Sequence, residues 1–209
     1  MYHFDYVSKK EAAPYKAKLI ELLNKVQDNV RDKFTFQFTF IGSSSRNMIT
    51  FDPTTNVGFD FDVNITVNDD EENYSPEKIR MVLHSALSRF MTAYGYNKCE
   101  QSKRVITIKA VDPWKARINH SCDFAIVHEG PSGQQYICFN KERKCFLWEF
   151  QTQPYKELAS RADYLKENEY WNEVLKVYRD KKNFNNNPEK HSRSLYAETI
   201  NECFMRHYK

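Results

Sequence analysis

Hydrophobic and polar residues alternate in several segments of the first 150 residues of this chain. The clearest segment is residues 34–40, where Phe occupies every second position, as in a half-buried strand. Comparable alternating or apolar runs cover residues 57–67, 104–110, 121–127, 135–139 and 145–150. These segments, separated by polar turns, predict a mixed β-sheet.

Apolar residues recur at helical spacing in other parts of the chain. They predict a helix over residues 12–32, with Pro14 in its first turn, and a second helix over residues 76–94. Ser75 is expected to cap the start of the second helix, and Gly95 is expected to end it. Beyond residue 154, three more helices are predicted around residues 158–165, 171–178 and 196–204.

The two patterns together predict the α+β class and a division into two domains. Residues 1–152 are expected to form a mixed β-sheet flanked by helices, and residues 153–209 a small C-terminal helical lobe. With 209 residues, 41% of them hydrophobic, the chain is long enough to bury about 70% of the surface of its unfolded form.

Composition excludes several classes of protein. No apolar run approaches the roughly 20 residues that span a bilayer, and the first residues lack the apolar core of a signal peptide, so we expect a cytoplasmic protein without a membrane partner. Five cysteines without a Cys-x-x-Cys pair indicate free thiols. The net charge of +3 is small, so a nucleic-acid partner is possible but is not indicated by charge.

Two carboxylates interrupt the predicted strand over residues 57–67. Asp60 and Asp62 are two residues apart, so they share one face, while Phe59, Phe61 and Val63 share the other. Like charges this close repel, and their removal from water costs several kcal/mol unless a cation lies between them. Mg²⁺ or Mn²⁺ suits such ligands and completes its shell with water and substrate phosphates. The pattern therefore indicates a metal site, and the alternative is an edge strand whose acids face water.

A turn of small polar residues follows the strand over residues 34–40. Its sequence is Ile41-Gly42-Ser43-Ser44-Ser45-Arg46. Glycine lets the backbone approach a phosphate, and the serines offer hydroxyl and amide groups to an anion. We expect Gly42, Ser43 and Ser44 to bind phosphates, with Ser43 as the first choice among the serines. The alternative is a plain turn.

The order of these motifs resembles the polymerase-beta-like nucleotidyltransferase superfamily. That family has a hydrophobic residue followed by Gly-Ser, then an Asp-x-Asp strand, then a third acid on a neighbouring strand. The matching residues are Ile41-Gly42-Ser43, Asp60-Phe61-Asp62 and Asp123, within residues 34–150. The segment between Ser43 and Asp60 looks longer than in compact members of the family.

This resemblance implies a nucleotidyltransferase that uses two Mg²⁺ (or Mn²⁺) ions. Asp60 and Asp62 would bind both ions, and Asp123 would bind one of them and is a candidate general base. A nucleoside monophosphate would pass from a nucleoside triphosphate such as ATP to a hydroxyl acceptor (a small molecule, a nucleotide or a protein), with release of pyrophosphate. The nucleotide phosphates would lie at Gly42, Ser43 and Ser44. The alternative function is a catalytically silent module of the same fold that binds a nucleotide or a protein partner.

Basic residues gather near the end of the helix predicted around residues 171–178. They are Lys176, Arg179, Lys181 and Lys182. They are candidates for holding a triphosphate, and the alternative is a solvated helix end whose positive charge favours the helix dipole.

Overall fold

A computed structural model describes residues 2–56, 58–69, 73–150, 155–187 and 189–208 of the chain. The chain divides into two compact units. The larger unit comprises residues 6–51 and 56–151, and the smaller unit comprises residues 1–5, 52–55 and 152–209. The domain boundary at residue 152 stays a prediction.

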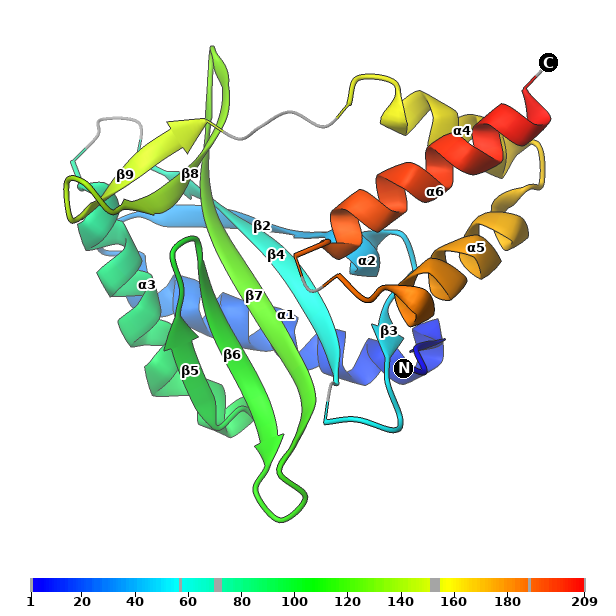
Figure 1. Cartoon of the computed structure of the whole chain (residues 1–209). Coiled ribbons are helices and arrows are strands. Elements are labelled where there is room, and N and C mark those ends of the chain that lie inside the picture. The colour runs from blue at the N-terminus through cyan, green and yellow to red at the C-terminus, as the bar shows by residue number, and fades with distance from the viewer. Residues whose placement is uncertain (1, 57, 70–72, 151–154, 188, 209) are drawn as a thin grey trace. The chain divides into compact units, whose positions relative to one another are not determined.

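The larger unit is built on a mixed sheet of seven strands among the described residues (Figure 1). The strand order is β2-β4-β7-β6-β5, and β8 pairs with both β7 and β9. β4 and β7 are parallel, while the other neighbours are antiparallel. The bounds are β2 (Thr35–Ile41), β4 (Phe59–Asn68), β5 (Lys98–Gln101), β6 (Val105–Asp112), β7 (Arg117–Gly130), β8 (Gly133–Asn140) and β9 (Cys145–Phe150). The predicted mixed sheet is confirmed.

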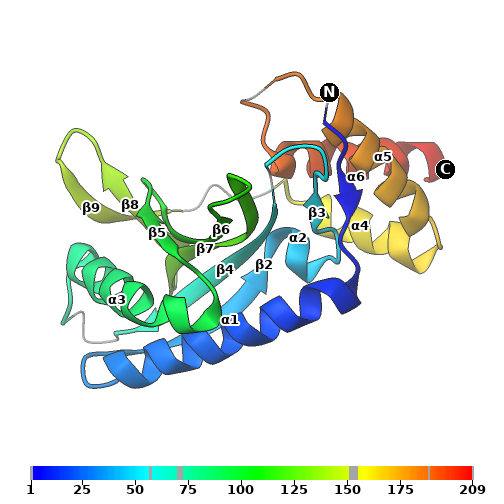
Figure 2. The same cartoon turned by 90° about the horizontal axis from the view of Figure 1, so that it is seen from below.

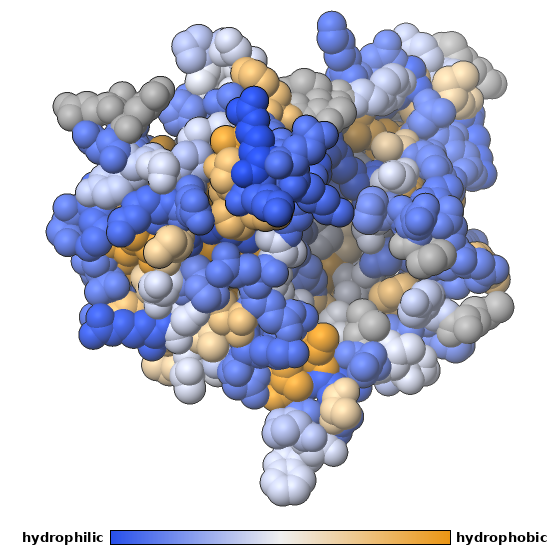
Figure 3. All heavy atoms as spheres, turned by 60° about the vertical axis from the view of Figure 1, so that its left-hand side comes forward, coloured by the Kyte–Doolittle hydropathy of each residue, from blue (hydrophilic) through white to orange (hydrophobic). Residues whose placement is uncertain are grey.

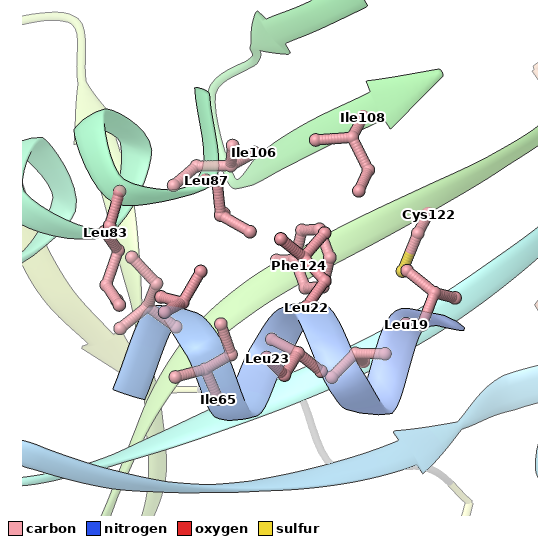
Figure 4. Packing of buried hydrophobic residues seen from close by; sticks show 14 of the residues in the cluster. Leu19, Leu22, Leu23, Ile65, Leu83, Leu87, Ile106, Ile108, Cys122 and Phe124 are labelled. Carbon is pink, nitrogen blue, oxygen red and sulfur yellow. The ribbon is translucent and has the colours of Figure 1, made fainter. Parts of the chain in front are cut away.

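Two long helices, α1 (Lys9–Val30) and α3 (Pro76–Phe90), lie on the same side of this sheet (Figure 2). Figure 4 shows their leucines facing the apolar side chains of the strands. The labelled residues of this core are fully buried, and they are Leu19, Leu22, Leu23, Ile65, Leu83, Leu87, Ile106, Ile108, Cys122 and Phe124. Each large side chain of this kind contributes about 1.5–3 kcal/mol on burial.

The start of α1 differs from the sequence prediction. Ser8 caps the helix, and its hydroxyl accepts the backbone N–H of Glu11, whose carboxylate accepts the backbone N–H of Ser8 in return. This capping box begins the helix at Lys9, three residues earlier than expected. Pro14 consequently lies inside the helix rather than in its first turn, so that part of the prediction is wrong.

The start and end of α3 agree with the prediction. Ser75 caps the helix by accepting the backbone N–H of Lys78. After Phe90 the chain continues as the short 3-10 helix η1 (Met91–Tyr94), and Gly95 ends it with a φ of +89°. That left-handed conformation strains residues with a side chain, which is why glycine serves there.

The smaller unit contains the three predicted C-terminal helices. They are α4 (Leu158–Glu167), α5 (Trp171–Phe184) and α6 (Ser192–His207). Their buried apolar residues are Ala162, Leu165, Val174, Tyr178, Leu195, Tyr196, Ile200 and Cys203. On α5, Glu173 also pairs with Arg206 and His207 of α6.

Short elements complete the described chain. The four-residue helix α2 (Gly42–Ser45) follows β2 directly, and β1 (Asp5–Tyr6) and β3 (Thr50–Phe51) form a two-stranded sheet. Figure 3 shows a face with mostly hydrophilic side chains and scattered apolar ones. Among the described residues, no helix has the length and apolar character needed to cross a membrane.

Replacing Leu22 with Ala is expected to lower the free energy of unfolding by about 2–5 kcal/mol, because the fully buried side chain leaves a cavity. Ile20 on the same helix is 36% exposed, so Ile20→Ala is the matched control and should change stability by about 0.5 kcal/mol or less. Chemical denaturation followed by circular dichroism measures both variants. Equal losses would contradict the packing of α1 on the sheet.

Candidate active site

The three predicted carboxylates lie together in the larger unit. Asp60 and Asp62 are on β4, and Asp123 is on the neighbouring parallel strand β7, directly opposite Asp62 in the register. One oxygen of each carboxylate lies within 4.8 Å of the other two. Phe61, between the two acids of β4, is fully buried with α1 and α3. Strand alternation therefore puts the acids on the opposite face of the sheet from these helices.

Gly42 contacts the acid cluster directly. β2 pairs with β4 so that Ile41 lies opposite Asp62, and the chain turns sharply at the next residue. Gly42 has a φ of +65°, and a Cβ at this position would lie 2.3 Å from Oδ2 of Asp62. Both the backbone conformation and the available space therefore require glycine here.

Burial and mutual repulsion shift the titration of the three acids. Burial, with repulsion from Asp123 and Asp62, raises the pKa of Asp60 to about 7. Burial and the charge of Asp123 also raise the pKa of Asp62, although Arg46 opposes this shift. Burial raises the pKa of Asp123, against a hydrogen bond from Thr107 and the charge of Lys109. The cluster is therefore destabilised when fully ionised, and a divalent cation is the partner that such an oxygen set accepts.

Two hydroxyl groups orient the acids. Oγ of Ser121 donates to Oδ1 of Asp60 at 2.8 Å, and Oγ1 of Thr107 donates to Oδ1 of Asp123 at 2.5 Å. Each hydroxyl is on the strand position opposite its acid, because Asp60 pairs with Ser121 and Thr107 pairs with Asp123. Sequence reasoning missed both residues, since only the register between strands places them beside the acids.

The serine turn is the short helix α2. Oγ of Ser44 donates to the carbonyl of Ile41 at 2.8 Å, and Oγ of Ser45 donates to the carbonyl of Gly42 at 2.9 Å. The hydroxyl of Ser43 has no hydrogen-bond partner within the described part of the chain. The Ser43 hydroxyl is therefore available to a ligand, and the assignment of phosphate binding to Gly42, Ser43 and Ser44 stays a prediction.

A histidine close in sequence to Asp123 and the basic candidates on α5 make contacts elsewhere. His120 pairs with Phe59 on the helix-covered side of the sheet, where its ring contacts Phe59 and Tyr15, and burial lowers its pKa to about 4. In the smaller unit, Arg179 forms an ion pair with Asp5. Similarly, Lys181 pairs with Glu202, and Lys182 lies 4.2 Å from the ring centre of Phe4. These contacts agree with the interpretation of the basic residues on α5 as a stabilised helix end.

Comparison with solved structures identifies the fold. Vibrio cholerae DncV, a cyclic AMP-GMP synthase in complex with nonhydrolyzable GTP, matches with a TM-score of 0.58 at 17% identity, over 91% of this chain and 54% of that chain. The STING-associated CdnE c-di-GMP synthase from Capnocytophaga granulosa matches with a TM-score of 0.57 at 18% identity, over 98% of this chain and 64% of that chain. The chain has the polymerase-beta-like nucleotidyltransferase fold.

A more distant match to this nucleotidyltransferase fold is the CD-NTase CdnG from Bradyrhizobium diazoefficiens in complex with GTP, with a TM-score of 0.50 at 14% identity, over 69% of this chain and 40% of that chain. The chain spans about half the length of these solved structures. No protein-family model and no curated protein matches the sequence. The fold inferred from the Gly-Ser and Asp-x-Asp motifs is thus confirmed by structure.

Gly42→Ala is expected to weaken Mn²⁺ binding, because the added methyl group displaces the Asp62 carboxylate. Gly95 also has a positive φ, but a Cβ there meets no heavy atom within 4 Å, so Gly95→Ala is the control for backbone strain alone. Both variants should lose about 1 kcal/mol of stability from strain. Electron paramagnetic resonance of free Mn²⁺ measures the affinity, and unchanged affinity in Gly42→Ala would exclude a role for the close contact.

The stability of the protein without metal is expected to fall as the pH rises. The pKa of Asp60 is about 7 in the folded protein, against an ordinary value of 3.8. A pKa raised by folding means that ionisation disfavours the folded state, so up to about 4 kcal/mol is lost as the pH rises from about 4 to about 7. Thermal unfolding across this range measures the loss, and Mg²⁺ should reverse it above neutral pH.

Asp60→Asn should remove most of this pH dependence. Glu129→Gln, an exposed position on the same strand as Asp123, is the control and should leave it unchanged. An unaltered pH profile in Asp60→Asn would show that Asp60 is not the group responsible.

Proposed function

We propose that this protein is a metal-dependent nucleotidyltransferase that moves a nucleoside monophosphate from a nucleoside triphosphate to a hydroxyl acceptor and releases pyrophosphate. One observation carries the proposal: carboxylates from two adjacent parallel strands converge within 4.8 Å beside the Gly42-Ser43 turn. Buried like charges cost stability, so an arrangement of this kind is typical of a functional site.

Each part of the site has a role in this reaction. Asp60, Asp62 and Asp123 would hold two Mg²⁺ or Mn²⁺ ions, with the first two residues shared between the ions. When bound, the ions would neutralise the charge on the attacking and leaving oxygens. Asp123 would accept the proton of the acceptor hydroxyl as the general base.

The phosphates of the donor nucleotide would lie at the serine turn. Gly42 allows the backbone to come close to them, the hydroxyl of Ser43 donates to a phosphate oxygen, and Ser44 contributes its backbone N–H. Residues 1–152 would form the catalytic domain, and residues 153–209 would form the helical lobe.

The acceptor best supported by the structural matches is the hydroxyl of a second nucleotide. DncV structures contain GTP, 3'-deoxy ATP and the linear intermediate 5' pppA(3',5')pG. Two matched proteins are synthases of cyclic dinucleotides. By this likeness, the donors are ATP or GTP, and the product is a dinucleotide.

The test incubates the protein and Mg²⁺ or Mn²⁺ with each α-labelled nucleoside triphosphate, singly and in pairs. Pyrophosphate release and a new phosphodiester product are expected. Asp60→Asn, Asp62→Asn and Asp123→Asn should each reduce the rate at least about 100-fold, whereas Glu129→Gln on β7 should not. Triphosphate binding without pyrophosphate release, for nucleotides and a panel of other acceptors alike, would instead support the catalytically silent module.

A further inference from the structure

A cavity of about 350 Å³ lies in the larger unit, away from the acid cluster. The ends of β4, β7 and β9, the start of β8 and the first turns of α3 line it. Its volume falls within the range of small-molecule binding sites, which begins at roughly 300 Å³. The described residues that line it include aromatic, amide and imidazole side chains, so it differs from an apolar packing gap.

The sheet separates this cavity from the acids. Val67, which lines the cavity, is five residues beyond Asp62 on β4, a distance of about 17 Å along a strand. An odd number of residues also places the two side chains on opposite faces. On β7, His128 is likewise five residues beyond Asp123, so these two side chains also lie on opposite faces of the sheet. A molecule in the cavity therefore cannot touch the three carboxylates.

Aromatic rings form the walls of the cavity. The rings of Trp148 and His128 are in contact, with centroids 5.8 Å apart and planes at 49°. Tyr74, on another side, is fixed by an edge-to-face contact with Phe34 at 5.7 Å. Rings of this kind bind flat aromatic ligands by stacking, because every heteroaromatic base offers a π-face.

Two polar side chains can bind the edge of such a ligand. His128 and Gln135 face each other across β7 and β8. Neither side chain has a hydrogen-bond partner in the part of the chain that the structure describes. A glutamine amide has an N–H donor beside a carbonyl acceptor. This pair can form two hydrogen bonds with the adjacent acceptor and donor on the edge of a nucleobase.

The charged side chains described around the cavity disfavour a phosphate. No lysine or arginine is among the described residues that line it. Asp69, the acid at its rim, uses its two oxygens to accept the backbone N–H groups of Asn73 and Tyr74, at 3.1 and 2.9 Å. Among the described residues that line the cavity, a phosphate would therefore meet a carboxylate and no lysine or arginine.

We propose that this cavity binds an uncharged planar heterocycle of the nucleobase type, as a free base or a nucleoside. Trp148 stacks on the ring, and Gln135 and His128 bind its polar edge. This site is distinct from the acid cluster. The acid cluster suits the phosphates of a nucleotide and their cations, whereas the cavity suits the base.

The test titrates the full chain with adenosine and with guanosine in the presence of a chelator, so that no divalent cation supports binding at the acid cluster. Isothermal titration calorimetry should show saturable binding of at least one nucleoside. Trp148→Leu should weaken it about tenfold or more, and Gln135→Leu about tenfold. Trp148→Phe, which keeps a ring, should retain most of the affinity, which separates stacking from folding.

Asp60→Asn is the control for the other site and should leave nucleoside affinity unchanged. ATP should bind no more tightly than adenosine under these conditions. Absence of saturable binding at millimolar nucleoside, unchanged affinity in both Trp148→Leu and Gln135→Leu, or loss of binding in Asp60→Asn would overturn the proposal. None of these results depends on nucleotidyl transfer, so the two proposals fail separately.

Discussion

The repulsion between three half-buried carboxylates is the constraint on which the larger unit depends. Asp60, Asp62 and Asp123 each have a pKa above the ordinary value, so the fold holds them together at a cost in stability. Burial of the apolar side chains on the other face of the same strands offsets this cost. Phe61, between the two acids of β4, and Phe124, next to the third, are fully buried. Each strand thus contributes to the core on one face and to the site on the other.

This shared use of β4 and β7 makes the site sensitive to register. Asp62 faces Asp123 because the two strands pair in parallel with Phe61 opposite Cys122 and Val63 opposite Phe124. A slip of one residue would turn the acid of β7 toward α1 and place an apolar side chain beside the other acids. The buried neighbours prevent this slip, since it would expose them. Core packing therefore determines the geometry of the site.

The sequence predicted the features that local pattern controls. Alternation predicted the acid-bearing strand with its two faces, and Ser75 and Gly95 marked the ends of the second helical segment. The start of α1 was missed because the capping box at Ser8 lies outside the apolar repeat. The roles of Thr107 and Ser121 were missed for a different reason. Each hydroxyl bonds to the acid opposite it on the neighbouring strand, and the spacing of residues along one strand does not predict which distant strand pairs with it.

These two hydroxyls restrain two carboxylates of the acid cluster. Rotation about χ1 and χ2 of an aspartate would otherwise let its carboxylate move away from its neighbours and reduce the repulsion. Ser121 holds one oxygen of Asp60, Thr107 holds one oxygen of Asp123, and Gly42 lies so close to Asp62 that a methyl group has no room. Each acid is thus restrained by a different element, β7, β6 and α2 respectively. Because the side chains are restrained in advance, less of the binding free energy of a cation is spent on ordering them.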